Sequence, residues 1–196
     1  MPKSFNPNDI YARKAKKEGF LARSAFKLEF ILEKFPIIKN GDKVLDAGAS
    51  PGSWLQVVSS IIGKNGLAVG IDLNPIEFNA LNIKNIQCDI LKDECIEKIK
   101  DFAPFDSIIS DLAPKTSGIK IKDQALSEEL AEKVLELANI YLKKHGSVII
   151  KIFQGAEMQE IIRKMRSGYK NVHTYKPPAS RERSFETYLI GINKVD

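Results

Sequence analysis

The stretch DAGASPGSW, residues 46–54, decides the predicted fold. It follows a short apolar run typical of a strand, and it leads into a segment with helical spacing. Gly48 and Gly52 stand where the strand would turn into the helix, and glycine lets the backbone approach a ligand closely. Pro51 is compatible with the start of a helix, because its missing N–H would be unpaired there. The stretch is therefore typical of the first strand-to-helix turn of a doubly wound α/β domain.

The rest of the chain alternates apolar runs with helical patterns. Strands are predicted at residues 43–48, 67–73, 85–90, 106–112, 147–153, 172–176 and 186–192. Helices are predicted at residues 23–34, 53–62, 124–144 and 156–166. Asp123 is expected to cap the longest helix and Gly146 to follow its end. We predict a single Rossmann-like α/β domain with helices on both faces of a seven-stranded, mostly parallel sheet whose last strand is antiparallel.

Length and composition favour an ordinary globular protein. The 196 residues suit one domain with a sizeable core, and 43% are hydrophobic and 28% charged. No apolar run approaches the ~20 residues that span a bilayer, and the N-terminus lacks the apolar core of a signal peptide. Cys88 and Cys95 are the only cysteines, which favours a reduced, cytoplasmic protein. We expect a monomer with no metal site and no membrane partner.

Much of the net charge of +5 lies near the N-terminus. Six cations fall within fifteen residues, opposed only by Glu18, and they are Arg13, Lys14, Lys16, Lys17, Arg23 and Lys27. Aromatic residues are interleaved with them, at Tyr11, Phe20 and Phe26. Such a segment suits a polyanion such as RNA, and it is equally compatible with a solvated helix face whose rings turn to the core. Residues 1–10 are expected to form a loose tail.

Carboxylates lie at the ends of three successive predicted strands. Asp72, at the end of the second strand, is suited to the two hydroxyls of a ribose, and Asp89, at the end of the third, to an adenine amino group. Asp46 would serve an amino-acid moiety. The G-x-G-x-x-G fingerprint of nicotinamide sites is absent. The set matches S-adenosylmethionine, and the alternative, that these residues only form turns, does not explain three carboxylates in register.

The same stretch, residues 46–54, resembles the D-x-G-x-x-P-G-[GS]-W motif of the FtsJ/RrmJ family of ribosomal RNA ribose 2′-O-methyltransferases (RlmE type). Further matches follow in the family's order, namely RSAFKL (23–28), GIDLNP (70–75), QCDI (87–90), SDLAPKTSG (110–118), VIIKIFQG (148–155) and SRERSFETYLI (180–190). The resemblance implies a methyltransferase domain at residues 23–196 that uses S-adenosylmethionine, preceded by a basic RNA-binding segment at 1–22. It also implies that Trp54 lies near the cofactor, whereas Trp54 taken alone would be a core-packing residue.

The resemblance further implies a K-D-K-E catalytic set, which falls on Lys27, Asp111, Lys151 and Glu186. Asp111 and Lys151 lie at the carboxyl ends of predicted strands, where open α/β sheets bind ligands. Asp111 is also expected at the cofactor. Lys151 interrupts an apolar run, and a buried lysine is rare unless it is paired. Taken alone, Lys27 would be a solvated helix residue and Glu186 a charge at a strand edge.

A ribose hydroxyl must lose its proton as it attacks a methyl group, so the chemistry needs a proton acceptor. We predict Lys151 in that role and Asp111 as the residue that positions it, while Lys27 and Glu186 orient the ribose. A lysine that acts as a base must be neutral. Burial and the charge of Lys27 favour the neutral form, whereas the two carboxylates oppose it, so the four groups would titrate as a coupled set.

The chain has little beyond the catalytic domain. The resemblance to small members of the family therefore implies that the substrate is a uridine of 23S ribosomal RNA, in the large ribosomal subunit. A tRNA ribose 2′-O-methyltransferase is the alternative. A non-catalytic RNA-binding module with the same fold is a second alternative, opposed by the intact catalytic set. A small-molecule methyltransferase is a third, opposed by the basic N-terminal segment. Phosphate contacts by that segment would supply affinity, and RNA shape would select the ribose.

Overall fold

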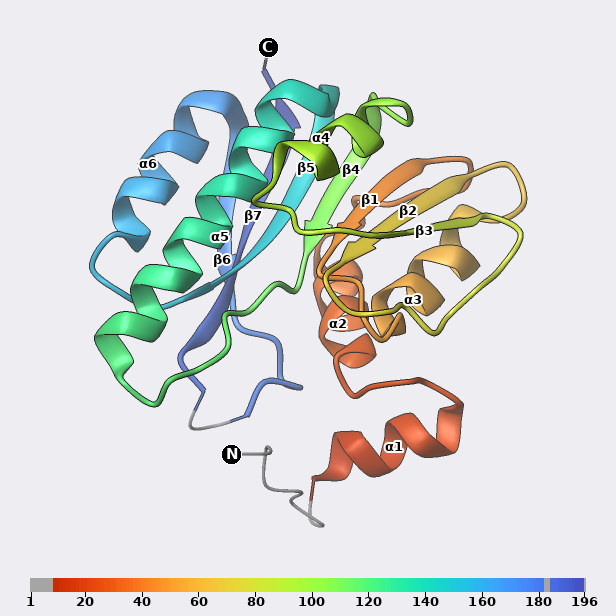
Figure 1. Ribbon diagram of the computed structural model, residues 1–196, viewed down its shortest axis with the longest axis horizontal. Helices are drawn as coiled ribbons and strands as arrows, with labels where there is room; N and C mark the ends of the chain where they lie inside the picture. The colour runs from red at the N-terminus through yellow and green to blue at the C-terminus, as the bar shows by residue number, and fades with distance from the viewer. Residues whose placement is uncertain (1–8, 182–183, 196) are drawn as a thin grey trace.

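Within residues 9–181 and 184–195, the part of the chain that the computed structural model describes, seven strands form one sheet (Figure 1). The strands are β1 (Lys43–Ala47), β2 (Leu67–Asp72), β3 (Ile83–Gln87), β4 (Phe105–Ser110), β5 (Leu142–Phe153), β6 (Tyr169–Tyr175) and β7 (Glu186–Lys194). The helices are α1 (Ile10–Glu18), α2 (Ala25–Lys34), α3 (Ser53–Ile62), α4 (Asp93–Lys100), α5 (Lys120–Tyr141) and α6 (Met158–Gly168).

The strand order is β3-β2-β1-β4-β5-β7-β6. The pairs β1–β2, β2–β3, β1–β4 and β4–β5 are parallel, whereas β7 is antiparallel to both of its neighbours, β5 and β6. The predicted mostly parallel sheet with an antiparallel last strand is therefore confirmed. The strand order reverses between β1 and β4, and open α/β sheets bind ligands at the carboxyl edge of such a switch point.

Helices cover both faces of the sheet, as predicted. On β4, Ile108 packs in the core formed with α4, α5 and α6, whereas Ile109 packs in the core formed with α2 and α3. On β5, Ile150 packs in the first of these cores and Ile149 in the second, because successive strand residues point to opposite faces. Lys151 comes next along β5 and therefore belongs to the α2–α3 face. None of the helices in the described ranges is both long and apolar enough to cross a bilayer.

Helix α1 was not predicted, since residues 1–10 were expected to form a loose tail and the first helix was expected at residues 23–34. The carboxylate of Asp9 caps the helix by accepting a hydrogen bond from the N–H of Ala12 at 3.1 Å. Gly19 ends it in a left-handed conformation with φ of 80°. Both capping residues were readable in the sequence. The predicted tail at residues 1–8 lies outside the described residues.

The long helix is shifted from its predicted range. Helix α5 begins at Lys120, so Asp123 lies in its first turn and not at the N-cap. There its carboxylate accepts hydrogen bonds from the N–H groups of Ser117 at 2.7 Å and Gly118 at 3.2 Å, which fixes the preceding loop. The chain becomes extended directly after the helix, and Gly146 lies within β5 instead of ending α5.

The expectation of two reduced cysteines is wrong for this structure. A disulfide joins Cys88 and Cys95, whose Cα atoms are 5.4 Å apart. Cys88 directly follows β3, and Cys95 lies in the first turn of α4. The short connection between the two elements therefore brings the two sulfur atoms together.

A lysine from the last strand closes the carboxyl end of α5. Lys194 is buried, and its Nζ donates hydrogen bonds to the carbonyl oxygens of Ala138, Asn139 and Leu142 at 3.0, 2.5 and 3.1 Å. The last carbonyls of a helix have no partner within the helix, and a cation there also interacts favourably with the helix dipole. Lys194 therefore joins β7 to the junction between α5 and β5.

We predict that Lys194→Met lowers the free energy of unfolding by about 1–3 kcal/mol, because buried carbonyl groups lose their donor. Urea denaturation measures the change. Lys170→Met, at an exposed position of β6, is the matched control and should change the free energy by less than about 0.5 kcal/mol. Equal stabilities of the two variants would contradict the capping role of Lys194.

Candidate active site

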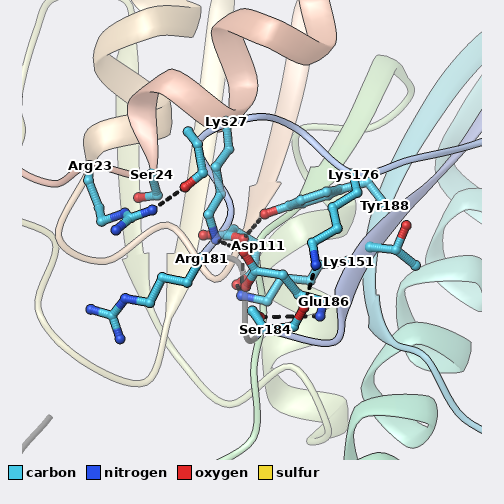
Figure 2. A network of polar contacts seen from close by, with 12 residues as sticks. Arg23, Ser24, Lys27, Asp111, Lys151, Lys176, Arg181, Ser184, Glu186 and Tyr188 are labelled. Carbon is cyan, nitrogen blue, oxygen red and sulfur yellow. Dashed lines mark hydrogen bonds and ion pairs between the residues drawn. The ribbon is translucent and has the colours of Figure 1, made fainter. Parts of the chain in front are cut away.

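Four charged side chains from separate segments meet at the carboxyl edge of the sheet (Figure 2). Lys27 comes from α2, Asp111 follows β4, Lys151 lies in β5, and Glu186 is the first residue of β7. The Nζ of Lys151 donates to the side-chain Oδ1 of Asp111 at 3.0 Å and to its backbone oxygen at 2.8 Å. The Nζ of Lys27 lies 2.5 Å from Oε1 of Glu186. The structure thus brings together all four residues of the predicted catalytic set as two ion pairs.

Strand register explains how Asp111 and Lys151 meet. Ser110, the last residue of β4, pairs with Ile150 of β5, so the next residue of each strand continues the alignment. Lys151 is only 7% exposed and is surrounded by an apolar strand. Lys27 and Glu186 are also buried, so neither the solvated-helix nor the strand-edge interpretation of these residues is correct. The side chain of Asp111 is half-buried. Removal of two ion pairs from most solvent contact is typical of a site rather than of a solvated surface.

Tyr188 belongs to the same cluster and was missed in the sequence. It pairs with Lys151 across β5 and β7, and its hydroxyl donates to Oδ1 of Asp111 at 2.6 Å. The ring of Trp54 packs against it with a centroid distance of 5.9 Å. Tyr188 lies two residues after Glu186, hence on the same face of the strand, and that alternation is the signal that could have revealed it.

The electrostatics of the cluster favour ionised carboxylates. Burial opposes the ionisation of Asp111, but the charges of Lys151 and Lys27 and the hydrogen bond from Tyr188 outweigh it and hold the pKa of Asp111 below its usual value. Burial also opposes the ionisation of Glu186, but the charge of Lys27 outweighs it and lowers the pKa of Glu186. Burial and the adjacent Asp111 carboxylate raise the pKa of Tyr188 well above its usual value, so its hydroxyl stays protonated and donates.

The glycine turn adjoins this cluster. Gly48 and Gly52 have φ of 86° and 119°, a region that side chains disfavour. A Cβ on Gly48 would lie 2.9 Å from the side chain of Leu112, beside Asp111. Helix α3 begins after Gly52 as its N-cap, so Pro51 precedes the helix and does not lie in its first turn as the sequence suggested.

Asp72 and Asp89 lie at the ends of the next strands, as predicted. Oδ2 of Asp72 accepts from the N–H of Ser50 at 3.1 Å, which ties β2 to the glycine turn. Asp89 lies two residues beyond β3, and its Oδ1 accepts from the N–H of Leu91 at 3.0 Å. Among the described residues, no three His, Cys, Asp or Glu side chains are grouped so as to hold a metal ion.

Asp46 shows that the site fits a cationic ligand. Both carboxylate oxygens are buried and have no hydrogen-bond partner among the described residues. Burial and the charges of Asp111 and Asp72 raise its pKa well above the usual value. A positively charged amino or sulfonium group of S-adenosylmethionine near Asp46 would favour its ionised form and lower its pKa. The orphaned carboxylate, the glycine turn and Asp72 together fit that cofactor.

Trp54 is a core residue in this structure. It is 2% exposed, and its Nε1 donates to the backbone oxygen of Ser24 at 2.8 Å, which links α3 to α2. The packing interpretation of Trp54 is therefore correct. Its contact with the cofactor stays a prediction.

The basic N-terminal segment divides into two parts. Arg13, Lys16 and Lys17 are exposed on α1, while the rings of Tyr11, Phe20 and Phe26 pack together with Ala15 and Ala179. The charged face and the inward rings, treated as alternatives in the sequence, therefore occur together. Arg23 and Lys27 do not belong to the exposed patch. Arg23 pairs with Asp9 and donates to the carbonyl of Ala179, and Lys27 pairs with Glu186. Helix α1 lies beyond the carboxyl ends of the parallel strands (Figure 1).

Comparisons of sequence find matches over nearly the whole chain. The profile of the FtsJ-like methyltransferases matches residues 20–194. The ribosomal RNA large subunit methyltransferase E of Bdellovibrio bacteriovorus is 44% identical over 194 residues, which cover 97% of this chain and 99% of the relative. The Myxococcus xanthus protein of the same name is 39% identical, over 99% of this chain and 92% of its own.

Comparisons of structure give the same fold. A Plasmodium falciparum protein assigned as a ribosomal RNA methyltransferase superposes with a TM-score of 0.80 at 29% identity, over 90% of this chain and 99% of its own. Fibrillarin of Aeropyrum pernix, solved with natively bound S-adenosyl-L-methionine, superposes with a TM-score of 0.65 at 19% identity, over 86% of this chain and 76% of its own. The Rossmann-like methyltransferase fold is thereby confirmed.

We predict that Asp46→Asn stabilises the cofactor-free protein more at pH 8 than at pH 4. The raised pKa means that the protonated carboxyl favours the folded state, and this contribution is lost as pH rises through the folded-state pKa. Each unit by which the pKa is raised is worth about 1.4 kcal/mol. Urea denaturation at both pH values measures the difference.

Asp101→Asn, at an exposed position, is the control and should change stability by less than about 0.5 kcal/mol at either pH. An effect of Asp46→Asn that is the same at pH 4 and pH 8 would contradict the raised pKa of Asp46.

Proposed function

Because the chain belongs to the FtsJ-like methyltransferase family, we propose that it transfers a methyl group from S-adenosylmethionine to a ribose 2′-hydroxyl of large-subunit ribosomal RNA. Dependence on S-adenosylmethionine and action on ribosomal RNA follow from the family and its near-full-length relatives. The ribose hydroxyl, a uridine of 23S RNA, the assembled large subunit as substrate, a monomeric enzyme and a cytoplasmic location are the finer parts of the proposal. The observation that carries it is the buried pair of Lys151 and Asp111 beside the glycine turn.

The residues that would hold the cofactor follow the strand ends. Gly48 and Gly52 allow close approach, Asp72 suits the ribose, Asp89 the adenine, and Asp46 the amino-acid end. When bound, S-adenosylmethionine supplies a methyl group on a sulfonium, an electrophile that needs no further activation. The protein must therefore align the attacking hydroxyl and accept its proton.

The proposal assigns that proton to Lys151. Its two hydrogen bonds to Asp111 occupy two of the three hydrogen positions on Nζ. In the neutral amine the third position is a lone pair, which accepts the hydroxyl proton while Asp111 holds the nitrogen in place. Asp111 is itself held by Tyr188, so the acceptor is oriented through two hydrogen bonds in series. Lys27 and Glu186 stand beside this pair as groups that orient the ribose.

The arrangement of the cluster supports an enzyme over a non-catalytic RNA-binding module. Burial of an ion pair costs several kcal/mol per ion, and replacement by packed apolar side chains is often neutral or stabilising. Two such pairs around one point are therefore explained better by chemistry than by folding. A tRNA ribose remains the alternative substrate, but the names of the relatives favour ribosomal RNA.

We predict that Lys151→Met lowers kcat about 10²- to 10⁴-fold, the usual contribution of a general base, and leaves cofactor binding intact. The assay follows transfer of labelled methyl to undermethylated large subunits, and mass spectrometry of the digested RNA separates ribose from base methylation. Calorimetry reports cofactor binding, and Lys170→Met again serves as the control. Turnover near the wild-type rate would exclude Lys151 as the acceptor, and methylation of a base would exclude the proposed reaction.

We also predict that replacing Arg13, Lys16 and Lys17 by glutamine weakens RNA binding and reduces the slope of log K against log salt by about 3. The control replaces Lys64, Lys84 and Lys170 by glutamine, which removes the same charge from exposed positions outside α1. Binding isotherms at several salt concentrations give both slopes. Equal slopes for the two triple variants would show that α1 does not contact phosphates.

A further inference from the structure

Phe185 is the one exposed ring among the Phe, Tyr and Trp residues that the structure describes. It is 41% exposed, whereas the other described rings are buried or half-buried. It directly precedes Glu186 of the cluster. An aromatic ring that is exposed beside a site offers a face on which a base can stack.

The ring is held in a fixed orientation. It packs edge-to-face against Phe153, with a centroid distance of 5.9 Å and an interplanar angle of 89°. Its backbone oxygen accepts from the N–H of Gln154 at 2.8 Å, and Lys176 Nζ donates to the backbone oxygen of Ser184, the residue before it, at 2.6 Å. A ring that is preorganised in this way loses little entropy when a ligand binds.

The position of Phe185 distinguishes the substrate from the cofactor. The carboxylates and glycine turn that suit the cofactor lie at the carboxyl ends of β1, β2 and β3, on one side of β4 in the sheet. Phe185 enters β7, on the other side of β4, and its contact residue Phe153 ends β5. The pair of Asp111 and Lys151 lies between the two regions. Phe153 lies two residues after Lys151 and hence on the same face of β5. The ring therefore lies away from the cofactor residues, against the strand end that carries Lys151.

A cation accompanies the ring. Nζ of Lys120, the first residue of α5, lies 5.6 Å from the ring centroid. Single-stranded RNA is recognised by aromatic side chains that stack on bases and by cations that contact the adjoining phosphates. The pair of Phe185 and Lys120 has this chemistry.

We propose that Phe185 stacks on the base of the target nucleotide and thereby holds its ribose against Lys151. This inference rests on the proposed function. A stacking surface accepts any base, so selection of the nucleotide would come from the surrounding RNA and not from this ring.

The test compares Phe185→Ala, Phe185→Trp and, as a control, Ile140→Ala, an exposed apolar residue near the opposite end of α5. Phe185→Ala should lower kcat/KM for RNA about 5- to 150-fold, the factor for loss of one base–aromatic stack, without changing cofactor affinity. Phe185→Trp should retain activity, and its fluorescence should fall when RNA binds. The wild-type protein, whose single Trp54 is buried, should show no such change.

An RNA that carries the mapped methylation site but lacks the base at that nucleotide completes the experiment. On this RNA the kcat/KM of the wild-type enzyme should fall by the same factor, and the kcat/KM of Phe185→Ala should not fall further. The stacking role would be overturned if removal of the base and Phe185→Ala lowered kcat/KM additively, or if Phe185→Ala left kcat/KM unchanged. Either result would leave the proposed function intact. Absence of ribose methylation by the wild-type enzyme would instead overturn the proposed function.

Discussion

The buried ion pair between Lys151 and Asp111 is the interaction on which the organisation of this site depends. A lysine within an apolar strand is tolerated only when a carboxylate satisfies it, and removing one partner of a buried pair typically costs 3–5 kcal/mol. The register of β4 and β5 supplies that carboxylate. A slip of one residue would turn Lys151 to the opposite face of the sheet, so formation of the pair and correct strand pairing are the same event.

The pair also fixes elements that are distant in the chain. Asp111 accepts from Tyr188, Tyr188 packs on Trp54, and Trp54 donates to the backbone of Ser24. The chain of contacts runs from β4 through β7 and α3 to α2, the helix that carries Lys27. The second ion pair is thus positioned by the first through packed side chains. The stretch at residues 46–54 holds two glycines with positive φ and the tryptophan that joins Tyr188 to α2, so the glycine turn and the ion-paired cluster are built from one segment.

Much of the fold could be predicted because apolar periodicity reports local structure directly. Lys151 was also predictable, since a charge within an apolar strand needs a partner. The pairing of Lys27 with Glu186 was not, because 159 residues separate them and no spacing rule relates them; only the family resemblance joined them. Helix α1 was missed, although its capping residues were readable, because Ala15 is its only buried residue and its apolar periodicity is therefore weak.

Strand β7 lies between β5 and β6, although it follows both in the chain. During synthesis β5 and β6 therefore emerge while the place between them is vacant, and each presents an unpaired edge of the kind that promotes aggregation. The strand that fills the vacancy brings Glu186, Tyr188 and Lys194 with it. A nascent chain that stops short of β7 consequently has no complete site, and the enzyme matures only when its final strand is inserted.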